Sequence, residues 1–565
     1  MKSLPLTACL ALAAAPVQAM ACGGLFCNSA APIVQAGEQI LFAQDDDGTI
    51  HMHVQLNYAG PPQDFGWILP TPRGVETGLS TEGLFSSLSQ FAPSYSINSV
   101  ERLVDCAESD AGAVQNAGPF SDSGVAESGG AGGEPPPGVL VVSREVVGPF
   151  DRVILSAESV EDLRIWLDEN GYQIPAESDE RLRPYVEGGS VFVAIKLVAD
   201  AGTNDIVPLR LSFPGELPSI PIVPTSVAAT PDMGITVYVL GSARAIPANY
   251  LHVQVNEAAI DWSNSGSNYF DVVAQAADEA MGRAFATDFA GRHEARSDTS
   301  NFKPISATFK PISAGSIDAL RPTRTVGELA QAICDGGLPM RDIDVQRLLT
   351  DVISSPPQDG TANCETCLGC IGNASDEVIN GEELATRLTV EVNEPRESLK
   401  TLFDRHAYLT RLFTTMSPED MTADPAFIFG RDLPEVGSVH LATQLIDRCA
   451  ADGTYDTRNF TIRTPSGLML GVVDGEQADV IRREGGQTVR QGEEPGAAVI
   501  EQLLSSGQGR VEVDNVPDIV RRHERSADET TGCDCSTSGG KTTSSLLIGL
   551  LFLMSRLRRG RRQGR

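Results

Sequence analysis

The sequence has few basic residues for its length. Lysine and arginine number 43 against 75 aspartates and glutamates, which gives a formal net charge of -32. A surface of this sign repels nucleic acid and anionic lipid and attracts cations or basic partners, although it equally suits an exported protein that must stay soluble. We therefore expect no nucleic-acid partner.

The sequence also lacks the motifs of several common enzyme classes. No G-x-S-x-G occurs, so a serine-hydrolase elbow has no candidate. GGKT at Gly539–Thr542 resembles the end of a phosphate loop, but Cys535 occupies the place of its first glycine. HEARS at His293 lacks the second histidine of a metalloprotease helix. We therefore assign no catalytic residue and no cofactor, and we favour a non-enzymatic role without excluding an enzyme.

Residues 1–21 have the features of a signal peptide. Lys2 supplies the positive start, Leu4–Ala15 the apolar stretch, and Ala19-Met20-Ala21 the small-x-small cleavage site. The mature chain then begins at Cys22, which leaves open a lipoprotein acylated on that cysteine. Ordinary secretion is preferred, because Ala19 stands where the lipoprotein signal usually has Leu or Val.

The predicted mature body contains eight cysteines, an even number that suits complete pairing in an oxidising compartment. These disulfide candidates are Cys22, Cys27, Cys106, Cys334, Cys364, Cys367, Cys370 and Cys449. The local pair Cys22–Cys27 is the best single guess at a connectivity. The cluster CETCLGC has two alternatives to disulfides, a zinc site completed by Cys334 or Cys449 and a redox C-x-x-C pair.

One predicted hairpin carries two further groups of metal-ligating residues. His51 and His53 lie two apart on a predicted strand and so share a face. Asp45–Asp47 precede Gly48, and a carboxylate-rich hairpin tip is able to chelate calcium. The histidines have no identifiable third ligand, and a charged turn accounts for the aspartates, so we assign no metal site.

The tail, residues 529–565, has the features of a sorting signal. Fourteen uncharged residues lie between Lys541 and Arg556, and as a helix they reach about 21 Å, short of the roughly 30 Å hydrocarbon core. Six arginines occupy the last ten residues. We expect them to stay on the cytoplasmic side, so that the segment stalls in the inner membrane after the body has been exported. The alternative, a terminal helix packed on the body, would bring these arginines against a core.

Gly532-Cys533, a polar spacer, a short apolar stretch and the terminal arginines resemble the C-terminal sorting tags of myxobacteria and their relatives. This resemblance implies proteolytic removal of the apolar end and lipidation of Cys533, with Cys535 as the alternative. It also implies export and sorting machinery as partners, a transient inner-membrane intermediate, and a body anchored on the outer membrane at the cell surface.

The length of 565 residues and the hydrophobic content of 41% allow more than one core. Residues 22–296 are predicted to form an α+β domain with a largely antiparallel sheet, because strand-like runs follow one another with helices in clusters. Residues 39–44 and 49–58 predict a hairpin, and ESVEDLRIWLDENGY predicts a helix that ends before Gly171. The Gly-, Ser- and Pro-rich stretch 107–138 predicts a flexible loop.

Four stretches of this domain resemble a known family. They are CGGLFC near the mature start, YAGPPQDFGWILPTP, FDRVILSAESVEDLRIWLDENGYQIP and LRPYVEGGSVFVAIKL. They are similar to the exported bacterial family catalogued as domain of unknown function 2330, over about residues 22–265. The resemblance implies export and the extent of the domain, but its motifs are structural and it implies no mechanism.

A connector and a second module are predicted to follow. The connector, residues 297–315, contains FKPIS twice, at Phe302 and Phe309, and its prolines prevent a continuous helix. Residues 316–528 are predicted to form a mainly helical module with the cysteine-rich loop inside it. VGELAQAICDGGLPMRDIDVQRLLTDVI and SLKTLFDRHAYLTRLFTTM have apolar residues at helical spacing, and FTIRTPSGLMLGVVD adds two short strands.

These features favour an exported, surface-displayed, disulfide-stabilised protein with a non-enzymatic role in binding, adhesion or envelope structure. Two alternatives stay open, a surface hydrolase with catalytic residues at scattered positions and a calcium- or zinc-binding module. A pocket that joins a histidine to a carboxylate favours the enzyme, whereas a smooth acidic surface favours the binding protein. Trp67, Trp166 and Trp262 are predicted to be core anchors rather than ligand platforms.

Overall fold

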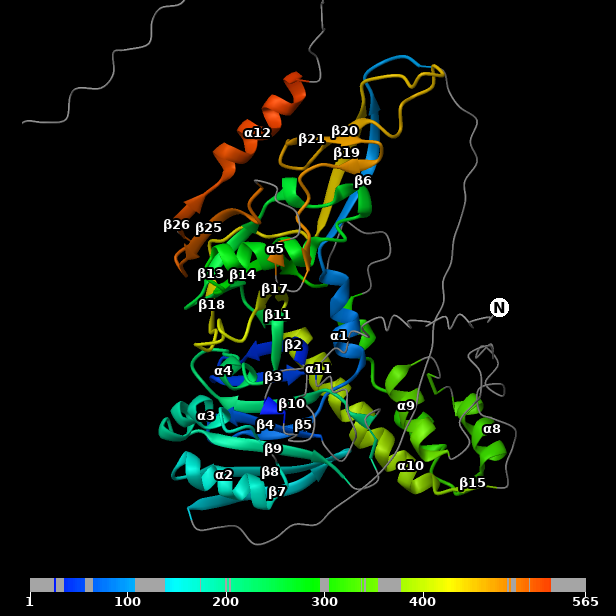
Figure 1. Cartoon of the computed structure of the whole chain (residues 1–565). Helices are drawn as coiled ribbons and strands as arrows, with labels where there is room; N and C mark the ends of the chain where they lie inside the picture. The colour runs from blue at the N-terminus through cyan, green and yellow to red at the C-terminus, as the bar shows by residue number, and fades with distance from the viewer. Residues whose placement is uncertain are drawn as a thin grey trace, which may run out of the picture.

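Helices and strands are mixed along the chain, and most neighbouring strands run antiparallel. Figure 1 shows the strands in layers, with one sheet projecting at one end and a group of helices at one side. The α+β class is therefore confirmed. The computed structural model describes residues 25–26, 35–55, 65–106, 138–294, 304–353 and 377–529, apart from 173, 199–200, 203–204, 337, 340–341, 485–486, 489–493 and 508.

A ten-stranded sheet forms the centre of the molecule. Its order is β26 (Gly509–Asp514), β25 (Ala497–Leu503), β13 (Leu251–Val255), β14 (Ala284–Arg292), β17 (Tyr408–Met416), β11 (Ala229–Gly241), β2 (Gln35–Gln44), β3 (Thr49–Val54), β10 (Leu209–Pro214) and β5 (Glu76–Leu79). The pairs β11–β2 and β13–β14 are parallel, and the other pairs in this order are antiparallel. β2 and β3 form the hairpin predicted around the acidic turn.

A second sheet packs face to face on the central sheet. Its five strands are, in order, β1 (Leu25–Phe26), β4 (Gly66–Thr71), β9 (Val191–Leu197), β8 (Phe150–Ala157) and β7 (Val139–Val147). Side chains alternate between the two faces of a strand. Trp67 and Leu69 of β4 therefore share one core with Ile40 and Phe42 of β2, while Ile68 faces the other way.

Two helices cover the outer face of this second sheet, α2 (Val160–Glu169) and α3 (Ser178–Glu187). α2 begins where the Ser159 side chain accepts a hydrogen bond from the Asp162 N–H, which satisfies one of the free donors of the first turn. It ends before Gly171, whose φ of 72° requires glycine. This helix and its end are as the sequence predicted.

The opposite face of the central sheet is covered by α1 (Gly83–Leu88), α6 (Ile305–Thr308) and α11 (Glu394–Arg405). Their apolar side chains pack on Leu41 and Leu240 of the sheet. Ile305 of the first FKPIS copy and Phe309 of the second are only 0% and 2% exposed here. Residues of the predicted connector from 304 onward therefore contribute to the core of the molecule.

The mainly helical module predicted at 316–528 is not confirmed. Helices do occupy its first part, namely α8 (Val326–Gly336), α9 (Ile343–Val352), α10 (Gly381–Arg387) and α11. From Tyr408 the chain forms strands, and β17 lies inside the central sheet between β11 and β14. The stretch SLKTLFDRHAYLTRLFTTM splits because its second half is rich in threonine and aromatic residues and finds a strand partner on each side.

A third sheet projects at the end of the molecule that is uppermost in Figure 1. Its five strands are, in order, β22 (Glu476–Gln477), β21 (Met469–Val473), β20 (Phe460–Arg463), β19 (Val439–Ile446) and β6 (Ser94–Arg102). Trp262 packs edge-on against Tyr95 of β6 in the core beneath this sheet. Trp67, Trp166 and Trp262 are 0%, 2% and 1% exposed, so their burial as core anchors is confirmed.

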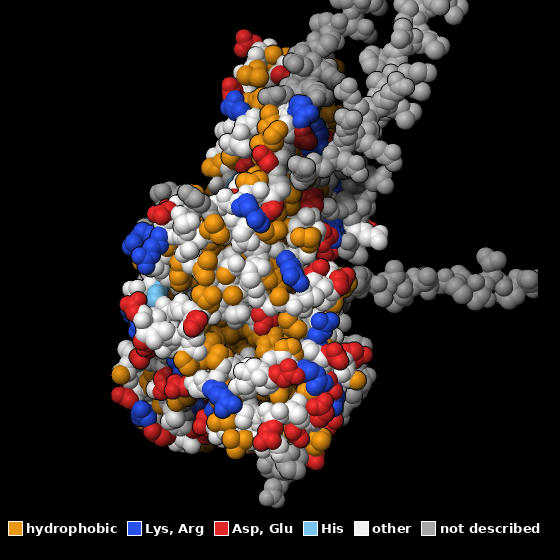
Figure 2. Space-filling view, turned by 90° about the vertical axis from the view of Figure 1, so that its left-hand side faces the viewer, with side chains coloured by type: hydrophobic (Ala, Val, Ile, Leu, Met, Phe, Trp, Pro, Cys, Tyr) orange, Lys and Arg blue, Asp and Glu red, His pale blue; other side chains and the backbone are white. Residues whose placement is uncertain are grey.

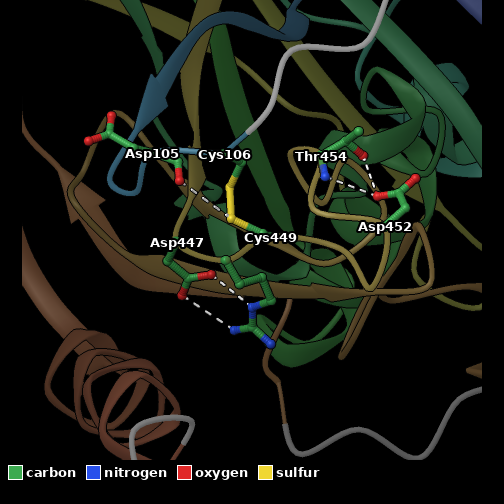
Figure 3. Close-up of a disulfide and its surroundings, with 7 residues drawn as sticks. Asp105, Cys106, Asp447, Cys449, Asp452 and Thr454 are labelled. Atoms are coloured by element: carbon green, nitrogen blue, oxygen red, sulfur yellow. Dashed lines mark hydrogen bonds and ion pairs between the residues drawn. A yellow bond between two sulfur atoms is a disulfide. The ribbon is translucent and has the colours of Figure 1, made fainter.

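A disulfide between Cys106 and Cys449 joins the ends of β6 and β19 (Figure 3). The two residues are 343 positions apart in the sequence, and their Cα atoms are 5.7 Å apart. Cys449 is therefore not free to bind zinc together with CETCLGC. This corrects the version of the zinc alternative in which Cys449 is the fourth ligand. The other cysteine predictions fall outside the described residues or side chains, at Cys22, Cys27, Cys334, Cys364, Cys367, Cys370, Cys533 and Cys535.

The predicted signal peptide, residues 107–137 of the predicted loop and residues 530–565 of the tail also lie outside the described residues. In the part of the chain that is described, no helix combines the length and the apolar character needed to cross a membrane.

Replacing both Cys106 and Cys449 by serine is expected to lower the free energy of unfolding by about 2 to 5 kcal/mol, because the bond restricts a long loop in the unfolded chain. Chemical denaturation measures the loss, and hydrogen exchange locates it in β6 and β19. Ser99→Ala is the matched control, since it removes a 2.9 Å hydrogen bond to Thr443 between the same strands and is expected to cost about 1 kcal/mol or less. If the double variant is as stable as the wild type, the Cys106–Cys449 bond does not stabilise the protein as predicted.

Candidate functional site

The acidic turn between β2 and β3 directs one carboxylate inward. Asp45 accepts hydrogen bonds from His406 Nε2 at 3.0 Å and His51 Nε2 at 3.2 Å, and it forms an ion pair with Arg405 at the end of α11. Burial on its own raises the pKa of Asp45, but these three partners outweigh it and hold the pKa at about 2. Asp45 is therefore a permanent anion that attaches α11 to the hairpin.

The other two aspartates of the turn do not join it. Asp47 accepts a hydrogen bond from the Thr49 N–H at 2.9 Å, and Asp46 is exposed. Asp45 and Asp47 therefore have different partners, and the structure shows no shared contact between them. Across the described ranges, no group of three or more histidine, cysteine, aspartate and glutamate side chains is placed to hold a metal ion.

His51 and His53 share a face of β3, as their spacing predicted, but they do not meet at a common ligand. His51 Nδ1 lies 2.9 Å from Ser212 Oγ on the neighbouring strand β10, and His53 Nδ1 lies 2.8 Å from Ser80 Oγ. His53 is 1% exposed, and burial, together with the charges of Arg210 and His51, lowers its pKa to about 3. Its ring is therefore neutral, and its Nε2 has no hydrogen-bond partner among the described residues.

Arg210 stands opposite His53 in the ladder between β10 and β3. Gly78 on β5 leaves room for the guanidinium, since a Cβ there would lie 2.9 Å from Arg210 Nη2. Nη1 donates to Ser398 Oγ of α11 at 3.0 Å, whereas Nε is buried and has no partner. No described carboxylate forms an ion pair with Arg210. A guanidinium with this much unused hydrogen-bonding capacity has the chemistry to bind an anion.

A groove of about 430 Å³ lies between α11 and this face of the sheet. It is lined by Asp45, His51, Arg210, Glu394, Glu397, Ser398, Thr401, Leu402 and Arg405. The volume is within the range of small-molecule sites, about 300 to 1,000 Å³. Asp45 and Arg405 neutralise each other, so the groove presents Arg210 on the sheet side and two exposed glutamates, Glu394 and Glu397, on the helix side.

In two places a hydroxyl contacts an imidazole that in turn contacts a carboxylate, which is the arrangement of a catalytic triad. The first is Ser212, His51 and Asp45, but Ser212 is not among the residues that line the groove. A ligand in the groove therefore meets His51 and Asp45 rather than the hydroxyl.

The second set is Thr287, His252 and Glu501. His252 Nε2 lies 3.1 Å from Thr287 Oγ1, and Nδ1 lies 3.1 Å from Glu501 Oε1. Arg244 Nη2 approaches the same Nε2 at 3.2 Å, and burial lowers the pKa of His252. Arg244 therefore occupies the Nε2 lone pair of His252 that a general base needs. The contacts of this set join β25 to β13 and β14.

The surface charge of the protein does not gather on the face drawn in Figure 2. Acidic and basic side chains are interspersed there, and hydrophobic side chains are exposed along its middle. This view does not show a uniformly acidic face. Such a face would favour recognition by long-range charge alone.

The sequence pointed to part of this site. Asp45, His51 and His53 were singled out, while Arg210, Ser212, Ser398 and Arg405 were not. Arg210 gives one local signal, because it interrupts the apolar run of IVPLRLSF. Its neighbour on α11 lies 188 positions away in the sequence, and no local pattern indicates that contact.

Comparison with known proteins matches the chain to a family model. The model of a family described as an uncharacterized protein conserved in bacteria (DUF2330) matches residues 16–322, which is more than half of the chain. No curated protein and no solved structure matches the chain.

Asp45→Asn is expected to lower the free energy of unfolding at neutral pH by about 1 to 2 kcal/mol, because it removes the charge that Arg405, His406 and His51 stabilise. The native pKa lies below the ordinary value of 3.8, so this stabilisation is present above pH 3.8 and is lost as the pH falls through about 2. Urea unfolding between pH 2 and 7 measures the difference. Asp46→Asn, at the exposed neighbour, is the matched control, and an Asp45→Asn deficit that persists unchanged at pH 2 contradicts the assignment.

Proposed function

The chain belongs to the bacterial family DUF2330, and we propose that it is an exported protein that binds a small ligand without transforming it. The ligand site is the groove between α11 and the β3–β10 face. The protein is displayed at the cell surface, where its processed and lipidated C-terminus anchors it to the outer membrane.

The disulfide supports the exported part of this proposal. Disulfides persist in oxidising compartments and are rare in the cytosol of most cells. The Cys106–Cys449 bond joins two strands of the third sheet that the order of the chain leaves far apart. The signal-like residues 1–21 and the sorting-tag-like tail agree with the same destination.

Arg210 carries the binding part of the proposal. Its guanidinium reaches the groove, holds one hydrogen bond to Ser398, and has no ion pair with any residue that the structure describes. Guanidinium groups bind carboxylates through two parallel hydrogen bonds, which makes an anionic group of a ligand the natural partner. The groove does join a histidine to a carboxylate, His51 to Asp45, which is the feature expected of an enzyme. The hydroxyl that His51 contacts belongs to Ser212, which is not among the residues that line the groove, and we therefore favour binding over catalysis.

Export is tested by fractionating the producing cells and measuring the intact mass of the protein with and without reduction. We expect the protein at the cell surface, cleaved near Cys22, shortened at its C-terminus, carrying an acyl group on Cys533 or Cys535, and with Cys106 and Cys449 protected from thiol reagents before reduction. A full-length cytosolic protein with both of these thiols free contradicts the exported part of the proposal.

Binding is tested by titrating the purified, folded protein with pentanoate, a simple monocarboxylate. We expect saturable binding that Arg210→Gln weakens at least about tenfold, because a hydrogen bond to a charged group contributes about 1.5 to 3 kcal/mol. Arg510→Gln, at an exposed arginine on β26, is the matched control and is expected to leave binding unchanged. Binding that survives Arg210→Gln contradicts the site.

A surface hydrolase is the second candidate, and the contacts of His51 with Ser212 and Asp45 favour it. In that case Ser212 Oγ is the nucleophile and is labelled by a fluorophosphonate probe, and His51→Gln abolishes the labelling. Our proposal expects no probe on Ser212 when labelled peptides are mapped by mass spectrometry. Ser212→Ala gives the background for this measurement.

A further inference from the structure

We infer that the ligand of the groove is dipolar, with a carboxylate held by Arg210 and a cationic group held between Glu394 and Glu397. This inference rests on the proposed binding function and narrows it to one chemical class. Three observations carry it: the state of Arg210, the unpaired glutamates of α11, and the spacing along that helix.

The sheet side of the groove accepts one negative charge. Among the described residues, Arg210 has no hydrogen-bond partner for Nε or Nη2, while Nη1 donates to Ser398 Oγ. The adjacent His53 is neutral and buried, and His51, which lines the groove, contacts the carboxylate of Asp45. Asp45 and Arg405 neutralise each other at the far end of the lining. A single carboxylate matches this side better than a doubly charged phosphate does.

The helix side of the groove presents two glutamates that the helix itself does not need. Acidic residues are often placed at a free helix N-terminus because the helix dipole stabilises them there. α10, the π-helical turn Leu388–Asn393 and α11 follow without a break, and the Glu394 N–H already donates to the Thr389 carbonyl. Glu394 and Glu397 therefore lie within a continuous helical run, where that explanation does not apply.

The nearest helical cation is also engaged elsewhere. Lys400 is three positions after Glu397, a spacing that permits a contact, but it forms its ion pair with Asp404. The structure gives the Glu394 and Glu397 carboxylates no ion pair within the described ranges. Two exposed, unpaired carboxylates beside an unpaired guanidinium disfavour a simple anion and favour a ligand that brings a positive charge.

The helix limits the separation of the two charges. Ser398 contacts Arg210, Glu397 directly precedes Ser398 on α11, and Glu394 lies four residues before it. At a rise of about 1.5 Å per residue, a cationic group held at the Glu394 end lies up to about 6 Å along the helix from Ser398. Extended 5-aminopentanoate separates its carboxylate and ammonium groups by about the same distance. An α-amino acid places the same two groups side by side and matches the groove less well.

The test compares four small compounds by calorimetric titration of the full chain: 5-aminopentanoate, pentanoate, pentylamine, and 2-aminopentanoate, which is the isomer with adjacent charges. We expect 5-aminopentanoate to bind at least tenfold more tightly than each of the other three. Equal binding of 5-aminopentanoate and pentanoate overturns the dipolar ligand but leaves the anion site intact. Failure of all four compounds to bind overturns the proposed binding function as well.

Variants assign the two ends of the ligand. Glu394→Gln with Glu397→Gln is expected to reduce 5-aminopentanoate binding to the level of pentanoate without weakening pentanoate itself, whereas Arg210→Gln weakens both. Glu476→Gln with Glu484→Gln, at two exposed glutamates outside the groove, is the matched control. Unchanged circular dichroism spectra and melting temperatures show that the variants are folded. Undiminished 5-aminopentanoate binding in the double glutamate variant overturns the inference.

Discussion

Ile40 and Phe42 of β2 point into the core shared by the two large sheets, while Leu41 and Ala43 point into the core beneath α1 and α11. Water does not reach either face of such a strand. Polar side chains on the adjoining strands must therefore find their hydrogen-bond partners within the protein. This constraint explains why His51 and His53 each contact a serine on an adjoining segment. Arg210 is the exception on this face, because the structure gives its guanidinium few hydrogen-bond partners.

The same constraint governs the chain from α8 to α11. This helical excursion leaves the central sheet after β14 and returns to it as β17. Its last helix covers the face that carries the histidines and Arg210, and the contacts of Asp45 with Arg405 and His406 attach its end to the β2–β3 hairpin. The groove therefore exists only because a late segment folds back over an early one. Residues beyond the family match at 16–322 supply both β17 and the helix side of the groove.

The third sheet depends on different interactions. Tyr95 and Trp262 pack together at its base, and α12 (Val516–Glu529) contributes Ile519 to the same core. At its outer end, away from this core, the Cys106–Cys449 bond joins the two parallel strands. Val100 and Leu103 are exposed near this end of β6, and the covalent link there stabilises the pairing by restricting the unfolded chain.

The sequence by itself determined the elements whose signals are local. The β2–β3 hairpin follows from alternation around an acidic turn, α2 from its serine cap and Gly171, the burial of the tryptophans from their size, and the family from stretches of the N-terminal half. Tertiary structure alone decided the path of β17, the pairing of Cys106 with Cys449, and the meeting of Arg210 with α11. Each of these depends on contacts between residues more than 100 positions apart. Neither periodicity nor composition records which distant segment a strand, a thiol or a charge will meet, because that choice is made by the packing of the whole core.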